Sequence, residues 1–453
     1  MEGLLEKIGN QSLKIAVIGL GWMGLPTTCL FAEAGFQVIG VDIDLKVVKA
    51  INEKRTPIAE PEIDVLIKKN VENGRLKVTS SVKEATATSD AIIIVVPTGI
   101  TENKKPDYSA VEKTCREIGK VLQKGSIIIL ESTIGPGSTE GFVLEMLEKS
   151  SGLKAGVDFG LAYSPIRATA GRVIRDIQNY PRIVGGIDQK SLEIASSLFG
   201  TIVKGPIIKV KNLRTAEAIK LFENIYRDVN IALVNEFALL CEKLGIDFDE
   251  AMQAANSQPY SHLHSPGIGV GGHCIPVNPY FLLEKAEEQG IDLRMMKLAR
   301  KINDNMYSHA VKLIAEALRV CGKKIRRSKI AVLGVSFRSN AKETRYSMAK
   351  LVIDTLQRKG ATITIFDPKF TAEELKERGY NNSFSRIERA IENADCILIT
   401  VGHEEFRELP LSKLGPMMRR PAAIIDCGHI LDPAQVEKEG FVYRGVGRGV
   451  WTR

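Results

Sequence analysis

The sequence has no long apolar run, since no stretch approaches the roughly 18 uninterrupted apolar residues that a membrane helix needs. We also expect no secretory signal. The first ten residues carry acidic side chains early and lead directly into a strand pattern. We therefore expect a protein that does not span a membrane and that works in the cytoplasm.

Cysteine pairs and basic blocks are also absent. No CxxC pair occurs among seven widely spaced cysteines, namely Cys29, Cys115, Cys241, Cys274, Cys321, Cys396 and Cys427. This spacing indicates neither a disulfide framework nor a zinc site, and we expect no metal. The formal charge of +8 is spread along the chain. That argues against nucleic-acid binding but suits an anionic small molecule, and the basic residues 323–327 are predicted to be a solvated linker.

The apolar residues that are present form short runs separated by amphipathic stretches. With 453 residues, the chain is long enough for two or three domains. The first part holds five such runs, at residues 14–20, 37–44, 91–97, 126–133 and 159–165. Runs this apolar indicate strands buried on both faces, which is typical of a mostly parallel sheet wrapped by helices. We expect an α/β fold with two Rossmann-like, doubly wound domains joined by a helical region.

A glycine motif follows the first of these runs. Gly19, Gly21 and Gly24 form GxGxxG, with Leu20, Trp22 and Met23 between them, and Asp42 closes the second run. Strand, glycine turn, helix and terminal acid in this order indicate a dinucleotide site, in which the pyrophosphate lies on a helix N-terminus. A carboxylate at Asp42 would bind the ribose hydroxyls and favour NAD over NADP. The alternative is that the glycines only permit close packing of helix and strand.

Residues 212–244 contain neither proline nor glycine and show helical periodicity. A helix of about 30 residues would span about 45 Å, and such a helix often carries a dimer interface. Lys220 and Asn224 lie one turn apart on it, so an ammonium and a carboxamide share one face. The pair could stabilise the oxygen of an alcohol during oxidation, although Lys-x-x-x-Asn alone is usually a solvated face.

Two further patterns carry chemistry. The glycine-rich loop 266–276 contains Cys274, and a loop with so little side-chain cover can present a sulfur nucleophile to a ligand. The alternative is a small buried thiol beside a flexible turn. A second sheet pattern, at residues 330–337, 362–367, 396–401 and 423–427, has only Gly334 after its first run. Lys342, Arg345 and Ser347 then form a polar loop that could hold a phosphate or sugar, or no ligand.

The order and spacing of these motifs resemble the nucleotide-sugar 6-dehydrogenases, which include UDP-glucose, GDP-mannose and UDP-N-acetylhexosamine dehydrogenases. The resemblance covers nearly the whole chain and also includes residues 96–98 and 131–133. It implies an NAD-binding Rossmann domain over residues 1–205, a central helical dimerisation and catalytic domain over 206–315, and a UDP-sugar-binding Rossmann-like domain over 316–453. It also implies a homodimer or a larger homo-oligomer.

The resemblance further implies a reaction. Two NAD molecules take hydride in turn from C6 of a nucleotide sugar, and Cys274 carries the intermediate as a thiohemiacetal and then a thioester. Lys220 and Asn224 match the pair that stabilises the developing oxyanion, Thr133 matches a residue that positions water, and Asn278 lies at a further catalytic position.

The binding residues that the resemblance implies form two sets. The expected NAD-binding residues are Gly19, Gly21, Trp22, Met23, Gly24, Asp42, Pro97, Thr98 and Thr133. The expected substrate-binding residues are Arg167, Lys220, Asn224, His262, Gly269, Gly271, Phe337, Arg338 and Arg345. The form of residues 271–276, followed by residues 279–281, is similar to the N-acetylhexosamine branch. It favours UDP-N-acetylmannosamine over UDP-N-acetylglucosamine or UDP-glucose.

Three positions depart from the family pattern. Ile166 and Asn278 stand where the family usually has carboxylates, and Tyr260 takes the place of an arginine before the cysteine loop. Loss of a base would slow release of the acid without preventing binding. A substitute base is one possibility, and His262, His264 and Glu217 are the candidates. The alternatives are a degenerate relative that only binds NAD and a nucleotide sugar, and a hydroxy-acid dehydrogenase, which would need neither the cysteine loop nor a second nucleotide domain.

Overall fold

The computed structural model describes residues 1, 3–58 and 60–451. The chain forms two compact units, and the boundary between them falls inside two helices, α10 (Leu213–Leu244) and α12 (Asn278–Glu288). Unit 1 comprises Met1–Glu223 and Tyr280–Asp292, and unit 2 comprises Asn224–Pro279 and Leu293–Arg453. The three-part division at residues 205 and 315 stays a prediction.

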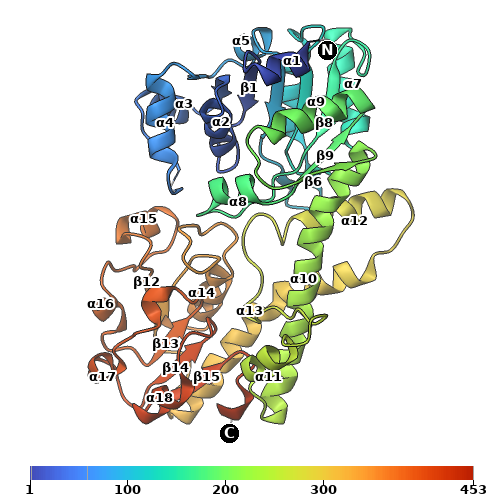
Figure 1. Cartoon of the computed structure of the whole chain (residues 1–453). Coiled ribbons are helices and arrows are strands. Elements are labelled where there is room, and N and C mark those ends of the chain that lie inside the picture. The colour runs from blue at the N-terminus through green and yellow to red at the C-terminus, as the bar shows by residue number, and fades with distance from the viewer. Residues whose placement is uncertain (2, 59, 452–453) are drawn as a thin grey trace. The chain divides into compact units, whose positions relative to one another are not determined.

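Unit 1 alternates strands and helices, as Figure 1 shows in blue to green. Its strands are β1 (Lys14–Ile18), β2 (Gln37–Val41), β3 (Leu76–Thr79), β4 (Ala91–Ile94), β5 (Gly99–Ile100), β6 (Pro106–Asp107), β7 (Ile127–Leu130), β8 (Gly160–Tyr163), β9 (Arg182–Gly186) and β10 (Ile207–Val210). Its helical segments before α10 are α1 (Leu4–Gly9), α2 (Gly24–Glu33), α3 (Leu45–Asn52), α4 (Ile63–Glu72), α5 (Val82–Ala87), α6 (Ser109–Gly119), η1 (Thr139–Val143), α7 (Leu144–Ser151), α8 (Val173–Asn179) and α9 (Gln189–Gly200).

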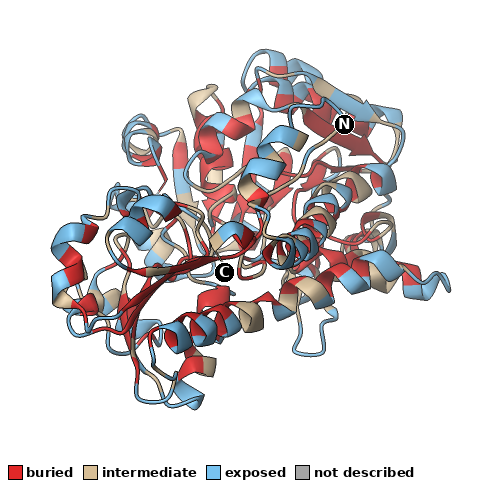
Figure 2. Cartoon of the chain, turned by 90° about the horizontal axis from the view of Figure 1, so that it is seen from below, coloured by how far each residue is buried: buried red, intermediate tan, exposed pale blue. Residues whose placement is uncertain are grey.

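Eight of these strands form one sheet in the order β10-β9-β8-β7-β4-β1-β2-β3. All neighbours pair in parallel except β8 and β9, which are antiparallel. Alternate residues of β1 enter two different cores: Ile15 and Val17 pack with α2 and α9, and Ala16 and Ile18 pack with α6 and α7. The sheet is therefore buried on both faces (Figure 2), which explains the unbroken apolar runs.

Unit 2 holds a second parallel sheet. Its strands are β11 (Lys329–Leu333), β12 (Thr362–Phe366), β13 (Cys396–Ile399), β14 (Ala423–Asp426) and β15 (Val442–Gly445). Its helical segments after α10 and beside α12 are α11 (Phe248–Ala255), α13 (Arg294–Val320), α14 (Met348–Arg358), α15 (Ala372–Glu377), α16 (Ile387–Ile391), η2 (Glu404–Phe406), α17 (Leu411–Leu414), η3 (Gly415–Met417), α18 (Pro433–Lys438) and η4 (Gly449–Trp451).

The strand order in unit 2 is β12-β11-β13-β14-β15, and every pair is parallel. Ile330 and Val332 face a core shared with α13 and α14, and Ala331 and Leu333 face the opposite core. The predicted doubly wound unit is confirmed. Among the described residues, no helix is both long and apolar enough to cross a membrane.

Besides the two-residue strands β5 and β6, four strands, β3, β9, β10 and β15, were not visible as apolar runs in the sequence. Three of them, β3, β10 and β15, lie at sheet edges, and β10 is half-exposed along its whole length. The fourth, β9, contains Arg182 and two glycines. Hydrophobic patterning is weak where a strand is exposed or where a buried charge interrupts it.

Candidate functional site

The glycine turn after β1 is shaped by two close backbone approaches. A Cβ on Gly19 would lie 2.5 Å from the carbonyl oxygen of Val95, and one on Gly24 would lie 1.8 Å from the carbonyl oxygen of Gly19. Gly21 differs, because a Cβ there would meet nothing within 4 Å. Close packing therefore accounts for the glycines at positions 19 and 24, which agrees with the alternative given above that the glycines only permit packing. It does not account for the glycine at position 21.

Asp42 is fixed against this turn. Its Oδ2 accepts a hydrogen bond from the Leu20 amide at 2.9 Å, and its Oδ1 accepts one from the Asp44 amide at 2.9 Å. The carboxylate is half-buried, so it also faces solvent at the end of β2. No side chain caps the N-terminus of α2, where Met23 is the N-cap. Open space above Gly21, uncapped helix amides and a terminal carboxylate fit the pyrophosphate and ribose of a dinucleotide.

The other expected NAD-binding residues lie at the same edge of the sheet. Pro97 and Thr98 follow β4, and Thr133 follows β7. These neighbouring loops are joined, because the Ser132 hydroxyl donates to the Val96 carbonyl oxygen at 2.6 Å. Carboxyl ends of neighbouring parallel strands meet at one edge, and this is where doubly wound sheets bind ligands.

Glu217 holds the loop that follows Thr133. Its carboxylate accepts hydrogen bonds from the amides of Gly137 and Thr139 and from the Thr139 hydroxyl. The side chain is fully buried, and burial raises the pKa of Glu217 to about 7 although these hydrogen bonds lower it. A carboxylate enclosed in this way fixes a loop, and its role as a substitute base stays a prediction.

Lys220 contacts the segment that follows β8. Its Nζ donates to the carbonyl oxygen of Ile166 at 2.6 Å. The Ile166 side chain is 6% exposed and packs in the core of unit 1. Arg167 is half-buried and pairs with Glu223 at 2.7 Å. The position where the family usually has a carboxylate thus presents a backbone carbonyl to Lys220.

In unit 2, two predicted catalytic residues have unsatisfied donors. The Nδ2 atoms of Asn224 and Asn278 have no hydrogen-bond partner among the described residues, although the two residues are 1% and 4% exposed. Asn278 lies one turn after Cys274, since its amide donates to the Cys274 carbonyl oxygen at 2.8 Å. Buried unpaired amide donors are rare, and an oxyanion of a bound substrate would satisfy them.

The cysteine loop is packed tightly on both sides. A Cβ on Gly269 would lie 2.5 Å from the Asn303 carbonyl oxygen, and one on Gly271 would lie 2.8 Å from Phe337. The amide of Gly267 donates to Asn235 Oδ1 at 3.0 Å. These contacts show that the loop is fixed, so its glycines allow close approach of backbone and neighbours.

His273 forms a side-chain hydrogen bond with Cys274, and this contact raises the pKa of the imidazole above its usual value. The charge of Glu343 also raises the pKa, whereas burial and the charge of Arg345 lower it. An imidazolium beside a thiol favours the thiolate, which is the nucleophilic form. His273 is not among the site residues predicted from the sequence, although its place directly before Cys274 was a usable signal.

The remaining predicted substrate residues lie in two loops of unit 2. Arg345 is exposed and pairs with Glu343 at 2.9 Å, and Arg338 follows Phe337 in the loop after β11. His262 is exposed, and its ring centroid is 6.4 Å from that of His264. Tyr260 is 92% exposed, so in this structure it contacts solvent instead of the cysteine loop.

Three family models match the chain. They describe the NAD binding domain, the central domain and the UDP binding domain of the UDP-glucose/GDP-mannose dehydrogenase family, and they match residues 13–203, 214–305 and 331–433. The three matches follow the order in which the glycine turn, the cysteine loop and the second sheet occur.

Curated relatives align over most of the chain. A UDP-N-acetyl-D-mannosamine dehydrogenase of Pyrococcus horikoshii is 40% identical over 437 residues, which cover 96% of this chain and 100% of the relative. An NDP-N-acetyl-D-galactosaminuronic acid dehydrogenase of Ralstonia nicotianae is 35% identical and covers 88% of this chain and 93% of its own length.

Solved structures of dehydrogenases are similar to this chain in fold. A UDP-D-ManNAc dehydrogenase of Pyrococcus horikoshii superposes with a TM-score of 0.89 at 39% identity, covering 97% of this chain and 100% of its own. A UDP-glucose dehydrogenase of Pyrobaculum islandicum has a TM-score of 0.86 at 24% identity and covers 96% and 98%. The second likeness concerns the fold alone.

The glycine turn yields a paired prediction. In Gly24→Ala the new methyl group collides with backbone, so we expect a lower melting temperature and loss of NAD binding. In Gly21→Ala the methyl group meets no protein atom. We expect an unchanged melting temperature and at least about tenfold weaker NAD binding, roughly 1.4 kcal/mol. Calorimetric titration and thermal unfolding would check both, and parent-like NAD affinity in Gly21→Ala would contradict the placement of the pyrophosphate.

The contact between His273 and Cys274 predicts a pH dependence of thiol reactivity. Because the pKa of His273 is raised, its positive charge persists to a higher pH than usual, and the stabilisation of the pair is lost as the pH rises through that value. In His273→Gln the iodoacetamide reaction of Cys274 should slow about tenfold near pH 7, with its midpoint at higher pH.

Peptide mass spectrometry can follow this reaction at each cysteine separately. Cys241, which is half-buried and lies outside the cysteine loop, serves as the internal control. An identical pH profile at Cys274 in both proteins would show that His273 has no influence on the thiol.

Proposed function

Since the chain belongs to the UDP-glucose/GDP-mannose dehydrogenase family, we propose that its substrate is UDP-N-acetyl-D-mannosamine and that it oxidises C6 to the carboxylic acid through Cys274. As a family member it is an oxidoreductase that uses NAD and a nucleotide-sugar substrate, as the sequence predicted. The observation that carries the cysteine mechanism is the cysteine loop itself, in which His273 contacts Cys274 and the unpaired donor of Asn278 lies one turn away.

In the proposed reaction each site residue has a separate role. NAD, when bound, accepts one hydride in each of the two oxidations. Lys220 and the Nδ2 donor of Asn224 stabilise the alcohol oxygen as it becomes a carbonyl. The Cys274 thiolate adds to the aldehyde carbon, and loss of the second hydride leaves a thioester. Water then adds to the thioester, the C–S bond breaks, and the acid and the thiolate are released.

Asn278 acts in this scheme as a donor. A carboxamide has no basicity, but it donates a hydrogen bond without needing to be protonated first. Its buried Nδ2 can bind the oxyanion that forms when Cys274 or water adds to the carbonyl carbon. The replacement of the usual carboxylate by asparagine is therefore compatible with catalysis, which favours an active enzyme over a degenerate relative.

The N-acetylhexosamine substrate is supported by the names of the relatives. Those of Pyrococcus horikoshii and Ralstonia nicotianae name N-acetylated sugars, and they differ in the hexose. UDP-N-acetylglucosamine and UDP-glucose are the alternative substrates. Phe337, Arg338 and Arg345 lie in the part that matches the UDP binding domain and would hold the nucleotide diphosphate. We also keep the cytoplasm as the proposed location, because NAD and nucleotide sugars are cytoplasmic metabolites.

The proposed reaction predicts a stoichiometry. Oxidation of an alcohol to an acid removes four electrons, so each UDP-N-acetylmannosamine should yield two NADH and consume one water. Three protons are released as well, because the acid is ionised at neutral pH. Absorbance of NADH with limiting sugar would measure this ratio. UDP-N-acetylglucosamine and UDP-glucose should react with kcat/KM lower by about tenfold or more. No NADH from any sugar, despite binding of NAD, would instead support the degenerate relative.

We further propose that the protein is a homodimer and that α10 forms its interface. Within unit 2 this helix exposes five large apolar side chains at near-heptad spacing, Tyr226, Leu233, Phe237, Leu240 and Leu244, each 40% to 59% exposed. They extend over about 27 Å of helix. An apolar stripe of this length on one helix is typical of an interaction surface.

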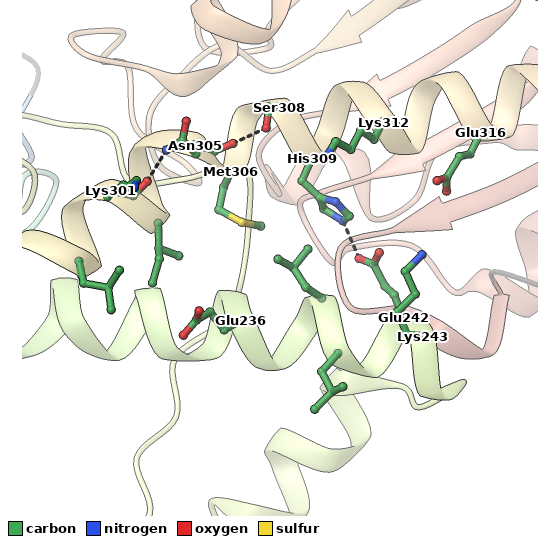
Figure 3. A pocket seen from close by; sticks show the side chains of 14 residues that line it. Glu236, Glu242, Lys243, Lys301, Asn305, Met306, Ser308, His309, Lys312 and Glu316 are labelled. Carbon is green, nitrogen blue, oxygen red and sulfur yellow. Dashed lines mark hydrogen bonds and ion pairs between the residues drawn. The ribbon is translucent and has the colours of Figure 1, made fainter. Parts of the chain in front are cut away.

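A groove between α10 and α13 continues this surface and has a volume of about 670 Å³ (Figure 3). Its rim carries both signs of charge, with Glu236 and Lys243 on α10 and Lys301, Lys312 and Glu316 on α13. A surface that carries both charges can complement itself, which a twofold interface requires. A second copy of the chain is therefore the occupant that we propose.

The proposed interface predicts that one added charge would prevent dimerisation. Leu240→Glu places a carboxylate in the apolar stripe and should convert a dimer into a monomer, which light scattering after gel filtration would measure. Leu351→Glu on α14 is the matched control, because Leu351 is 43% exposed and lies outside the groove. A parent protein that is monomeric, or a Leu240→Glu variant that stays dimeric, would contradict the interface.

A further inference from the structure

We infer that Glu223 is a positioning residue for Lys220: by pairing with Arg167 it holds the backbone whose Ile166 carbonyl fixes the Lys220 ammonium. The inference rests on the proposed function, because it assigns Lys220 a role in the oxidation. All the contacts that carry it lie within unit 1.

The first step concerns Lys220. A lysine that stabilises an oxyanion must keep its ammonium in one place, and its flexible four-carbon stem works against this. The Ile166 carbonyl oxygen accepts from Nζ at 2.6 Å, and Lys220 is half-buried. The Ile166 carbonyl oxygen is thus a fixed acceptor for one of the three donors of the ammonium.

The segment that carries this carbonyl is itself fixed by contacts. Residues 164–167 follow β8 as a loop, and contacts on each side fix them. Before Ile166, the buried Arg182 donates to both the hydroxyl and the carbonyl oxygen of Ser164, and Arg182 also pairs with the buried Glu131. The Ile166 side chain packs in the core.

After Ile166, the segment depends on Arg167. This guanidinium donates to the Pro181 carbonyl oxygen at 3.0 Å and pairs with Glu223 at 2.7 Å. Arg167 and Glu223 are 29% and 33% exposed, so the pair is shielded in part from water. A guanidinium that bridges a carbonyl and a carboxylate is fixed more firmly than either contact alone would fix it.

Helix α10 contacts this segment through two side chains. Lys220 and Glu223 are three residues apart in α10 and therefore lie on the same face. The two side chains reach consecutive residues of one loop, Ile166 and Arg167, so α10 and the loop are joined at two neighbouring points. Removal of the Glu223 charge would leave Arg167 with its contact to Pro181 and would weaken the hold on the Ile166 carbonyl.

The test is Glu223→Gln, which keeps the size of the side chain and removes its charge. With UDP-N-acetylmannosamine we expect kcat to fall by about tenfold to a hundredfold, because a small misplacement of a catalytic group has an effect of this size. KM and the melting temperature should stay close to the parent values. Glu223→Asp, which keeps the charge, should retain most of the activity. Glu193→Gln, which removes an exposed ion pair with Lys209 elsewhere in unit 1, should match the parent.

A second readout needs no substrate. Acetylation of Lys220 by acetic anhydride, followed by peptide mass spectrometry, should be several-fold faster in Glu223→Gln than in the parent, since the ammonium loses its fixed acceptor. An unchanged kcat or an unchanged acetylation rate would overturn the inference. A rise in KM alone would also overturn it and would indicate that Arg167 binds substrate. If the parent itself makes no NADH, the proposed function fails, and the acetylation rates still decide the positioning role.

Discussion

The candidate site depends above all on a buried polar network that fixes the cysteine loop. Asn303 on α13 donates to the carbonyl and carboxylate of Asp228 on α10, and Asn235 Nδ2 donates to Asn303 Oδ1 at 3.0 Å. Asn235 in turn accepts from the Gly267 amide at the base of the loop. Arg300 balances the charge of the buried Asp228. Because an unpaired buried polar group is costly, each member holds its neighbours in one arrangement. A glycine-rich loop gains from this network the rigidity that its own residues lack.

Close backbone approach is the second constraint, and it recurs in both units. The glycine turn of unit 1 admits no side chain at Gly24, and the cysteine loop of unit 2 admits none at Gly269. In each case glycine serves packing, and the ligand benefits because the packed backbone leaves amides or a sulfur uncovered. These distances separate the glycines that packing requires from those that it does not, and the binding role of the turn stays a prediction. Gly21 is the glycine of the turn that packing does not require.

The strands that could be predicted from the sequence are those buried on both faces of a sheet. Strands such as β1 and β7, buried on both faces, and the glycine-free and proline-free helix α10 were visible in the sequence, whereas the exposed edge strand β10 was not. The site was predictable where a motif has a fixed spacing, as in the glycine turn with Asp42. The partners of these residues were not, because the contacts of Lys220 with Ile166 and of Glu217 with Gly137 join positions far apart in the sequence. The structure also shows the surroundings of the two residues that replace the expected carboxylates. The Ile166 side chain packs in the core of unit 1, and the Asn278 side chain has an unpaired, buried donor.

In the proposed reaction Cys274 carries the sugar covalently between the two oxidations, and the other assignments follow from this step. It can be tested by rapid quenching of the parent protein with NAD and UDP-N-acetylmannosamine, followed by mass spectrometry of the peptide that contains Cys274. We expect a transient adduct of the oxidised nucleotide sugar on this peptide of the parent protein. In Cys274→Ser we expect no adduct and no acid. Formation of the acid at the parent rate by Cys274→Ser, with no adduct on the parent peptide, would contradict it.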